Sequence, residues 1–335
     1  MADPAVRHAH RDLADVRLLR FDVVTNDEPG SHRFEHCSTH PTDPPWSTTQ
    51  AAYRPPRTAA VGAAPAGERP PFGAARIAAM SDAPAVDPAL LDEAVELLRR
   101  AGELTLVWFR SDTLEIERKG DGTPVTAADK AAERFLRDEI IRRHPDDAII
   151  GEEEAGRDGT SGRTWIIDPI DGTKAFTHGV PLYCNLLAVN DEHGPAVGVI
   201  NLPALGETVY AGRGLGCFDN GRPARVSTRD RLTGAYLSSC GFDYWDDDLL
   251  LRVKHAGPVL RTWGDGYGYA LVATGRVDAM VDPEVAVWDV APLPVILAEA
   301  GGRFTNWAGT AAIDHGTGIA TNGLLHDEIL ALLAG

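Results

Sequence analysis

Residues 165–178 read Trp-Ile-Ile-Asp-Pro-Ile-Asp-Gly-Thr-Lys-Ala-Phe-Thr-His, and this stretch decides how the rest of the sequence is interpreted. Its apolar beginning predicts a short buried strand, which we expect Pro169 and Gly172 to end. Asp168 and Asp171 would then lie where the backbone turns and its carbonyl oxygens become free. Carboxylate and carbonyl oxygens suit Mg²⁺, so the stretch indicates a metal site at a strand end. Asp-Pro and Asp-Gly are also common turn dipeptides, and the stretch alone leaves that interpretation open.

Two further acidic segments accompany this stretch. Residues 149–154, Ile-Ile-Gly-Glu-Glu-Glu, repeat the layout of a β-branched strand that ends in Gly and is followed by carboxylates. Downstream, Trp288-Asp289 opens an apolar stretch that closes on Glu-Ala-Gly-Gly at residues 299–302. Acidic runs usually form solvated surfaces, but three clusters beside regular elements can converge on one pair of cations.

The order and wording of these segments resemble the signatures of the inositol monophosphatase family of Mg²⁺-dependent phosphatases. The resemblance covers about residues 85 to 335 and rests on three motifs in order. It implies the sugar-phosphatase fold, an α+β protein built as a layered αβαβα sandwich. It also implies a small-molecule phosphate ester as substrate and two or three Mg²⁺ ions as cofactor.

The resemblance assigns five metal ligands. In the family's pattern, Glu152 and Asp168 hold the tighter ion together with the backbone carbonyl of Ile170, while Asp171 and Asp289 bind the other. Two ions about 4 Å apart can hold the phosphate, activate a water and neutralise the leaving alkoxide. A helix-capping role for Asp289 is compatible with this, since a capping carboxylate still has a second oxygen.

Catalytic roles follow from the same pattern. The Thr173 hydroxyl would orient the attacking water, with Asp129 or Glu152 as its acceptor. The backbone N–H groups of Gly172 and Thr173, if they open a helix, would take phosphate oxygens. Asp129 has an alternative interpretation as the third residue of a capping box that begins at Thr126.

Supporting residues are expected around these groups. Glu153 would support the ligands from behind, and Lys119, one of four lysines, matches a family lysine near the site or is a solvated surface residue. The sequence departs from the family at Ala175, where the pattern has asparagine, and this puts local loop hydrogen bonds in doubt. Lys174 beside it could screen phosphate or face water.

Residues 261–282 resemble the histidinol-phosphatase branch of the family. Inositol phosphatases typically have a small residue or threonine where Asp265 stands. A carboxylate facing an amine or imidazolium gains charge-assisted hydrogen bonds of about 1.5–3 kcal/mol, so Asp265 and Asp282 favour a cationic alcohol phosphate. Alternatives are a helix N-cap for the first and a turn before Pro283 for the second. Arg261 could bind the phosphate or pair with Asp265.

The resemblance therefore implies a phosphomonoesterase that hydrolyses L-histidinol phosphate in histidine biosynthesis. An inositol-1-phosphatase or a broad phosphatase of the same fold is the alternative within enzymes. A catalytically idle binding protein is a third possibility, against which the intact Glu152, Asp168, Asp171, Thr173 and Asp289 argue.

Composition narrows the function classes. The 335 residues are 44% hydrophobic, which suffices for a sizeable core. A net charge of −17 argues against nucleic acid as a partner. The sequence contains no run of about 18 apolar residues, so it predicts no membrane-spanning helix. The four cysteines show no paired metal-ligand spacing, so we expect reduced thiols and a cytoplasmic protein. Relatives are usually dimers, and a homodimer is possible here.

Residues 1–79 differ from the rest of the chain. They contain 10 of the 23 prolines, no lysine and equal numbers of acidic residues and arginines. We expect them to be disordered or a non-native extension, with Met80 as the natural start. The catalytic domain would be residues 80–335, with a metal-site half at about 80–205 and a substrate-specificity half at about 206–335.

Periodicity and turn signals predict the elements of that domain. A helix is expected to begin at Asp289, with Pro294 bending its start. The other predicted helices are 88–109, 126–144 and 265–274, and the predicted strands are 114–119, 165–167, 186–189, 196–201, 207–211, 235–241 and 277–281.

Deleting residues 1–79 should change neither the melting temperature nor kcat/KM for a phosphate ester, because that segment has too little apolar periodicity to join a core. Thermal melts and phosphate-release assays of the two chains check this. A large fall in melting temperature, or loss of soluble protein, would show that the segment packs on the domain.

Overall fold

The computed structural model describes residues 83–112, 114–118 and 124–335, which belong to one compact unit. The predictions for residues 1–79, Met80, Lys119 and the turn at 120–122 lie outside the described residues. Within them, no helix is both long enough and apolar enough to cross a bilayer.

Two larger sheets and a small hairpin make up the β structure. The seven-stranded sheet has the order β3-β4-β5-β6-β7-β8-β9, in which only the β3–β4 pair is parallel. The five-stranded sheet has the order β11-β10-β12-β14-β13, with β10 parallel to both neighbours. The strands are β1 (Ile116–Arg118), β2 (Pro124–Thr126), β3 (Ala148–Gly151), β4 (Thr164–Asp171), β5 (Cys184–Asp191), β6 (Gly194–Leu202), β7 (Glu207–Gly212), β8 (Gly216–Asp219), β9 (Arg222–Pro223), β10 (Tyr236–Ser238), β11 (Val259–Arg261), β12 (Ala279–Asp282), β13 (Arg303–Thr305) and β14 (Gly318–Thr321).

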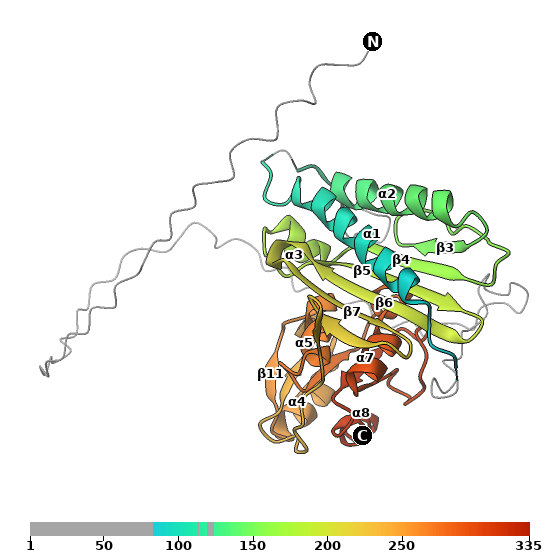
Figure 1. Cartoon of the computed structure of the whole chain (residues 1–335). Helices are drawn as coiled ribbons and strands as arrows, with labels where there is room; N and C mark the ends of the chain where they lie inside the picture. Colours follow the sequence, from blue (N-terminus) through green and yellow to red (C-terminus); the bar gives the residue numbers. More distant parts are fainter. Residues whose placement is uncertain (1–82, 113, 119–123) are drawn as a thin grey trace, which may run out of the picture. The chain divides into compact units, whose positions relative to one another are not determined.

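Helices form three layers around the two sheets. Helices α1 and α2 lie side by side over one face of the seven-stranded sheet, as Figure 1 shows. Helices α5 and α7 contact strands of both sheets, and α4 and α8 pack together on the five-stranded sheet's other face. The αβαβα sandwich is therefore confirmed. The helices are α1 (Pro88–Leu106), α2 (Ala127–Arg143), α3 (Thr173–Thr177), α4 (Asp247–His255), α5 (Asp265–Ala273), α6 (Val287–Val290), α7 (Leu293–Ala300) and α8 (His326–Ala334), with 3₁₀ turns η3 (Pro203–Leu205) and η4 (Phe242–Tyr244).

Local signals place the first two helices correctly. Asp87 caps α1 by accepting a hydrogen bond from the Ala89 N–H at 2.9 Å, directly before Pro88. Helix α2 begins after Thr126 with the expected capping box, in which Asp129 accepts from the Thr126 N–H at 2.8 Å. Apolar side chains of both helices join β4, β5 and β6 in one buried cluster.

The prediction of one helix beginning at Asp289 is wrong. The segment forms two helices, with Asp289 as the third residue of the short α6 and α7 beginning at Leu293. Pro292 lies at the break, because a proline donates no hydrogen bond to the preceding turn. The local sequence patterns also do not predict α4, α8, β9, β11, β13 and β14.

The C-terminal helix is attached through a buried histidine. His326 is 0% exposed, and its ring nitrogens lie 2.9 Å from Thr305 Oγ1 and 3.0 Å from Thr321 Oγ1. The Thr305 hydroxyl donates to a carbonyl, so Thr305 can only accept from the ring, and Thr321 can donate to the other nitrogen. This arrangement satisfies a neutral imidazole. Burial lowers the pKa of His326 to about 4.

The stability of the domain should therefore depend on this histidine below neutral pH. Since the pKa of His326 is lower in the folded state than the usual 6.5, its contribution is complete above pH 6.5 and is lost as the pH falls towards 4. The loss should reach about 3 kcal/mol of unfolding free energy. Urea unfolding between pH 4 and 7 measures it, and His326→Gln should flatten the slope. An unchanged slope in the variant would contradict the assignment.

Candidate active site

Strand β4 carries two of the predicted ligands. It continues through Pro169, which was expected to end it, and ends at Asp171, directly before Gly172 as expected. Asp168 pairs with Leu186 and Asp171 with Cys184 on β5, and the register shifts between the two pairs. A regular strand would point residues three apart to opposite faces. The irregularity accommodates a residue without an N–H and allows both carboxylates to point to the same place.

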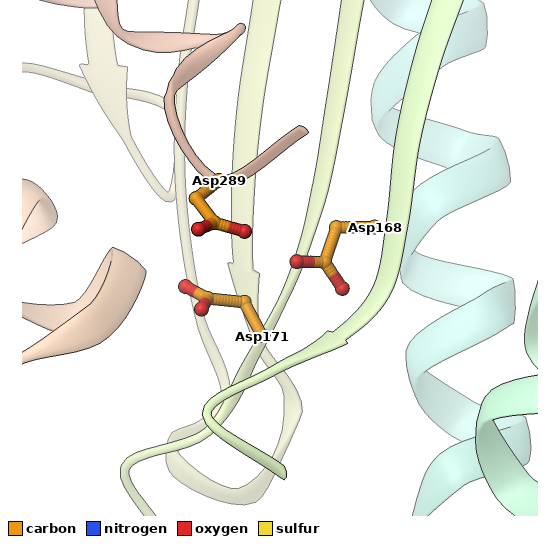
Figure 2. Close-up of side chains that lie close together, drawn as sticks. All are labelled: Asp168, Asp171 and Asp289. Carbon is orange, nitrogen blue, oxygen red and sulfur yellow. The ribbon is translucent and has the colours of Figure 1, made fainter. Parts of the chain in front are cut away.

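Three aspartates form the centre of the site. Asp168, Asp171 and Asp289 each offer an oxygen, and these oxygens lie within 4.8 Å of one another (Figure 2). Asp168 is 1% exposed and Asp171 is 9% exposed. Asp289 reaches the cluster from α6, where it also accepts a hydrogen bond from the Ala286 N–H at 2.8 Å. Capping and ligation are therefore compatible, as a carboxylate has two oxygens.

The described residues provide no ion pair that compensates the charge of the three aspartates. Within residues 83–112, 114–118 and 124–335, no lysine or arginine forms an ion pair with any of the three aspartates. Burial raises the pKa of Asp168 and Asp171 well above the ordinary range, and the charges of neighbouring carboxylates raise both further. Burial also raises the pKa of Asp289 to about 7. An all-oxygen donor set of this charge fits a hard divalent cation, so the cluster can hold a metal ion.

Glu152 lies with these aspartates. After burial, its charge is the next cause of the raised pKa of Asp168, which also shares a hydrogen bond with it. Its charge acts on Asp289 and Asp129 as well. The structure therefore brings the four predicted acidic ligands together.

A buried ion pair holds the Glu152 loop, and the sequence analysis misses it. Glu133 on α2 is 0% exposed and accepts hydrogen bonds from the N–H groups of Glu153 at 2.8 Å and Glu154 at 3.0 Å. Arg137, one turn later, donates to Glu133 at 2.8 Å. A Glu and an Arg at spacing i, i+4 on the buried side of a helix are the signal that could have revealed this pair.

Asp129 is the third residue of the capping box, as one of its two predicted interpretations has it. It is 0% exposed, and its Oδ2 accepts from the backbone N–H and the hydroxyl of Thr126 in the capping box. Its Oδ1 is buried without a hydrogen-bond partner among the described residues. Burial raises the pKa of Asp129 to about 6, and the charge of Glu152 also raises it. One oxygen thus serves the helix while the other stays available.

The segment after β4 turns sharply at Gly172. Its φ of 80° lies in the left-handed region, which glycine adopts without strain. Gly172 has no side chain with which to cap α3, so the N–H groups at the start of that helix are left for another acceptor. The Thr173 hydroxyl donates to the Ile170 carbonyl at 3.0 Å, and the Ile170 N–H donates to Asp168 at 3.0 Å.

Asp265 joins the site from α5. A Cβ atom at Gly172 would lie 2.9 Å from its Oδ2, so the carboxylate is directly above the turn. It is the first residue of the helix rather than its cap, and its φ is 54°. Burial raises its pKa to about 6. The next residue, Gly266, donates its N–H to Asp171, which also accepts from the Cys184 thiol at 3.3 Å.

Asp282 and Arg261 contact other protein groups and do not pair with Asp265. Asp282 is 0% exposed and accepts hydrogen bonds from the Tyr269 hydroxyl at 2.7 Å and the Cys240 N–H at 2.8 Å. Arg261 is exposed, and its guanidinium stacks on Tyr236 and Trp263 with 5.5 and 5.6 Å between Cζ and the ring centroids. It forms no ion pair with Asp265 in the described part of the chain.

Comparison with known proteins places this geometry in context. The sequence model of the inositol monophosphatase family matches residues 88–334. The histidinol-phosphatase of Mycobacterium tuberculosis is 43% identical over 250 residues, which are 72% of this chain and 96% of that protein. The histidinol-phosphatase of Chlorobaculum parvum is 40% identical over 253 residues, with the same coverage. The solved structure of an IMPase from Thermotoga maritima has a TM-score of 0.67 and 35% identity, covering 73% of this chain and 97% of that one.

Binding of a divalent cation should release protons and tighten with pH. Because burial raises the pKa of the site carboxylates, they keep protons to a higher pH than exposed carboxylates do, and a cation must displace those protons. Calorimetry with Mg²⁺ at pH 6 and 8, in two buffers of different ionisation enthalpy, should show more proton release and weaker affinity at pH 6. Asp171→Asn should weaken binding at least about tenfold. Heats that do not depend on the buffer would contradict the charge assignment.

Proposed function

The chain belongs to the inositol monophosphatase family and is a phosphoric monoester hydrolase, and from this premise we propose that it hydrolyses L-histidinol phosphate to L-histidinol and phosphate. The observation that carries the choice of substrate is the carboxylate of Asp265, which lies above Gly172 beside the cluster and pairs with no cation of the described chain. The similarity to two histidinol-phosphatases supports the same choice.

The cofactor is Mg²⁺, as two or three ions. Glu152, Asp168 and the Ile170 carbonyl would hold one, and Asp171 and Asp289 another. When bound, the ions polarise the phosphoryl oxygens, lower the pKa of a water and neutralise the leaving alkoxide. The burial of the aspartates without basic partners supports this assignment.

The remaining groups position the phosphate and move a proton. The free N–H groups at the start of α3 bind phosphoryl oxygens, at a turn where Gly172 lets the backbone come close. The Thr173 hydroxyl orients the attacking water, with Asp129, whose Oδ1 has no hydrogen-bond partner among the described residues, or Glu152 as its acceptor. Glu153 and Lys119 support these groups.

Asp265 recognises the alcohol part of the substrate. Its carboxylate faces the substrate's ammonium or imidazolium group, and a charge-assisted hydrogen bond results. Asp282 contributes from behind, because it fixes the backbone of Cys240 beside Asp265. Arg261 acts on the phosphate from a longer distance, because its guanidinium stacks on two aromatic rings.

Further features of the proposal concern the whole chain. Residues 80–335 are the catalytic domain, with metal binding concentrated in about residues 80–205 and substrate choice in about 206–335, and residues 1–79 are dispensable. The protein acts in the cytoplasm in histidine biosynthesis, as a homodimer. An inositol-1-phosphatase is the second candidate, which the likeness to the IMPase of Thermotoga maritima favours.

Phosphate release in the presence of Mg²⁺ tests the proposal, with L-histidinol phosphate, inositol 1-phosphate and a nucleotide 3′-phosphate as substrates. Histidinol phosphate should have the highest kcat/KM. Asp265→Asn should lower kcat/KM for histidinol phosphate roughly five- to thirty-fold, which corresponds to a loss of about 1–2 kcal/mol of transition-state stabilisation. It should leave kcat/KM for a neutral ester nearly unchanged.

Three outcomes would change the assignment. A preference for inositol 1-phosphate would favour the second candidate. An equal loss on both esters would make Asp265 a structural residue. No activity on any ester would support an idle binding protein.

A further inference from the structure

Lys174 and Tyr244 join two segments that border the candidate site. Lys174 follows Thr173 in α3, and its Nζ donates a hydrogen bond to the Tyr244 hydroxyl at 2.7 Å. The same Nζ lies 5.3 Å from the centroid of the Tyr244 ring. Tyr244 ends η4, which follows the strand that leads to Cys240, so the contact connects the phosphate-binding turn with the five-stranded sheet.

Lys174 is within electrostatic reach of Asp265 but does not pair with it. The pKa of Lys174 is raised mainly by its hydrogen bond with Tyr244, and more weakly by Asp265 and Asp243. Both Lys174 and Asp265 lie in the described part of the chain, where no ion pair forms between them. A lysine side chain is a flexible four-carbon stem with a mobile charge, so it could turn to the carboxylate if nothing else held it.

The segment that carries Tyr244 is anchored by the residue that follows it. The next residue, Trp245, is 7% exposed and packs against Trp307 with 5.9 Å between ring centroids. Its indole N–H donates to the Ser239 hydroxyl at 2.8 Å, and Ser239 in turn donates to the buried Asp282. Tyr244 itself is 46% exposed, so its hydroxyl can accept the hydrogen bond from Lys174.

We propose that Tyr244 is a positioning residue for substrate choice, an inference that rests on the proposed function. Its hydroxyl holds Lys174 away from Asp265, so the carboxylate stays available for the ammonium group of an amino-alcohol phosphate. Without the hydroxyl, Lys174 turns to Asp265 and competes with the substrate's cation. The competitor is internal, and it therefore raises KM for cationic esters and leaves neutral esters unaffected.

The test compares two substrates that share the phosphate group. We use L-histidinol phosphate as the cationic ester and glycerol 2-phosphate as the neutral one, with the full chain in saturating Mg²⁺. Tyr244→Phe should lower the ratio of their kcat/KM values about tenfold, through KM. The double variant Tyr244→Phe with Lys174→Met should restore the ratio to within about twofold of wild type, because the competing charge is gone.

Tyr210→Phe is the matched control, since this tyrosine lies on β7 and stacks on Phe218 away from the site. It should leave the ratio unchanged. Failure of the double variant to restore the ratio, or an equal loss on both esters after Tyr244→Phe, would make Tyr244 structural and overturn the inference. If the wild-type ratio favours histidinol phosphate and Tyr244→Phe has the same ratio, the inference about Tyr244 is overturned and the proposed function stands. A wild-type ratio that does not favour histidinol phosphate overturns the proposed function as well.

Discussion

The site is governed by the mutual repulsion of buried carboxylates. Asp168 and Asp171 are buried, the half-buried Asp289 and Glu152 lie beside them, and among the described residues no arginine or lysine pairs with the three aspartates. Desolvation and like charge both disfavour such a group in its ionised form. A divalent cation would offset both penalties together, so the cluster can hold a metal ion.

The surrounding architecture resists that repulsion. The bulge of β4 aims two carboxylates at one point, and the Gly266 N–H at the start of α5 meets Asp171. Glu133 and Arg137 fix the loop of Glu152 from α2. These supports come from both faces of the seven-stranded sheet, and the layered fold is what brings them within reach of one another.

Sequence and structure agree most closely where the signal is local. The capping box at Thr126 and the acidic motifs of the metal site were predictable, because each depends on a few adjacent residues. The continuation of β4 through Pro169 was not, since pairing with β5 outweighs the local turn signal. The different surroundings of Asp282 and Asp265 were equally hidden, because a motif gives the order of residues along the chain and not the direction of their side chains.

The backbone at Asp265 has an evolutionary consequence. Its φ of 54° is one that asparagine, aspartate and glycine enter readily, whereas a β-branched residue there is strained. Threonine, which is one of the residues that inositol phosphatases typically have at this position beside small ones, would therefore be strained on the present main chain. Replacement of Asp265 by a β-branched residue would require the loop to be rebuilt along with the side chain, whereas a glycine would keep the present main chain.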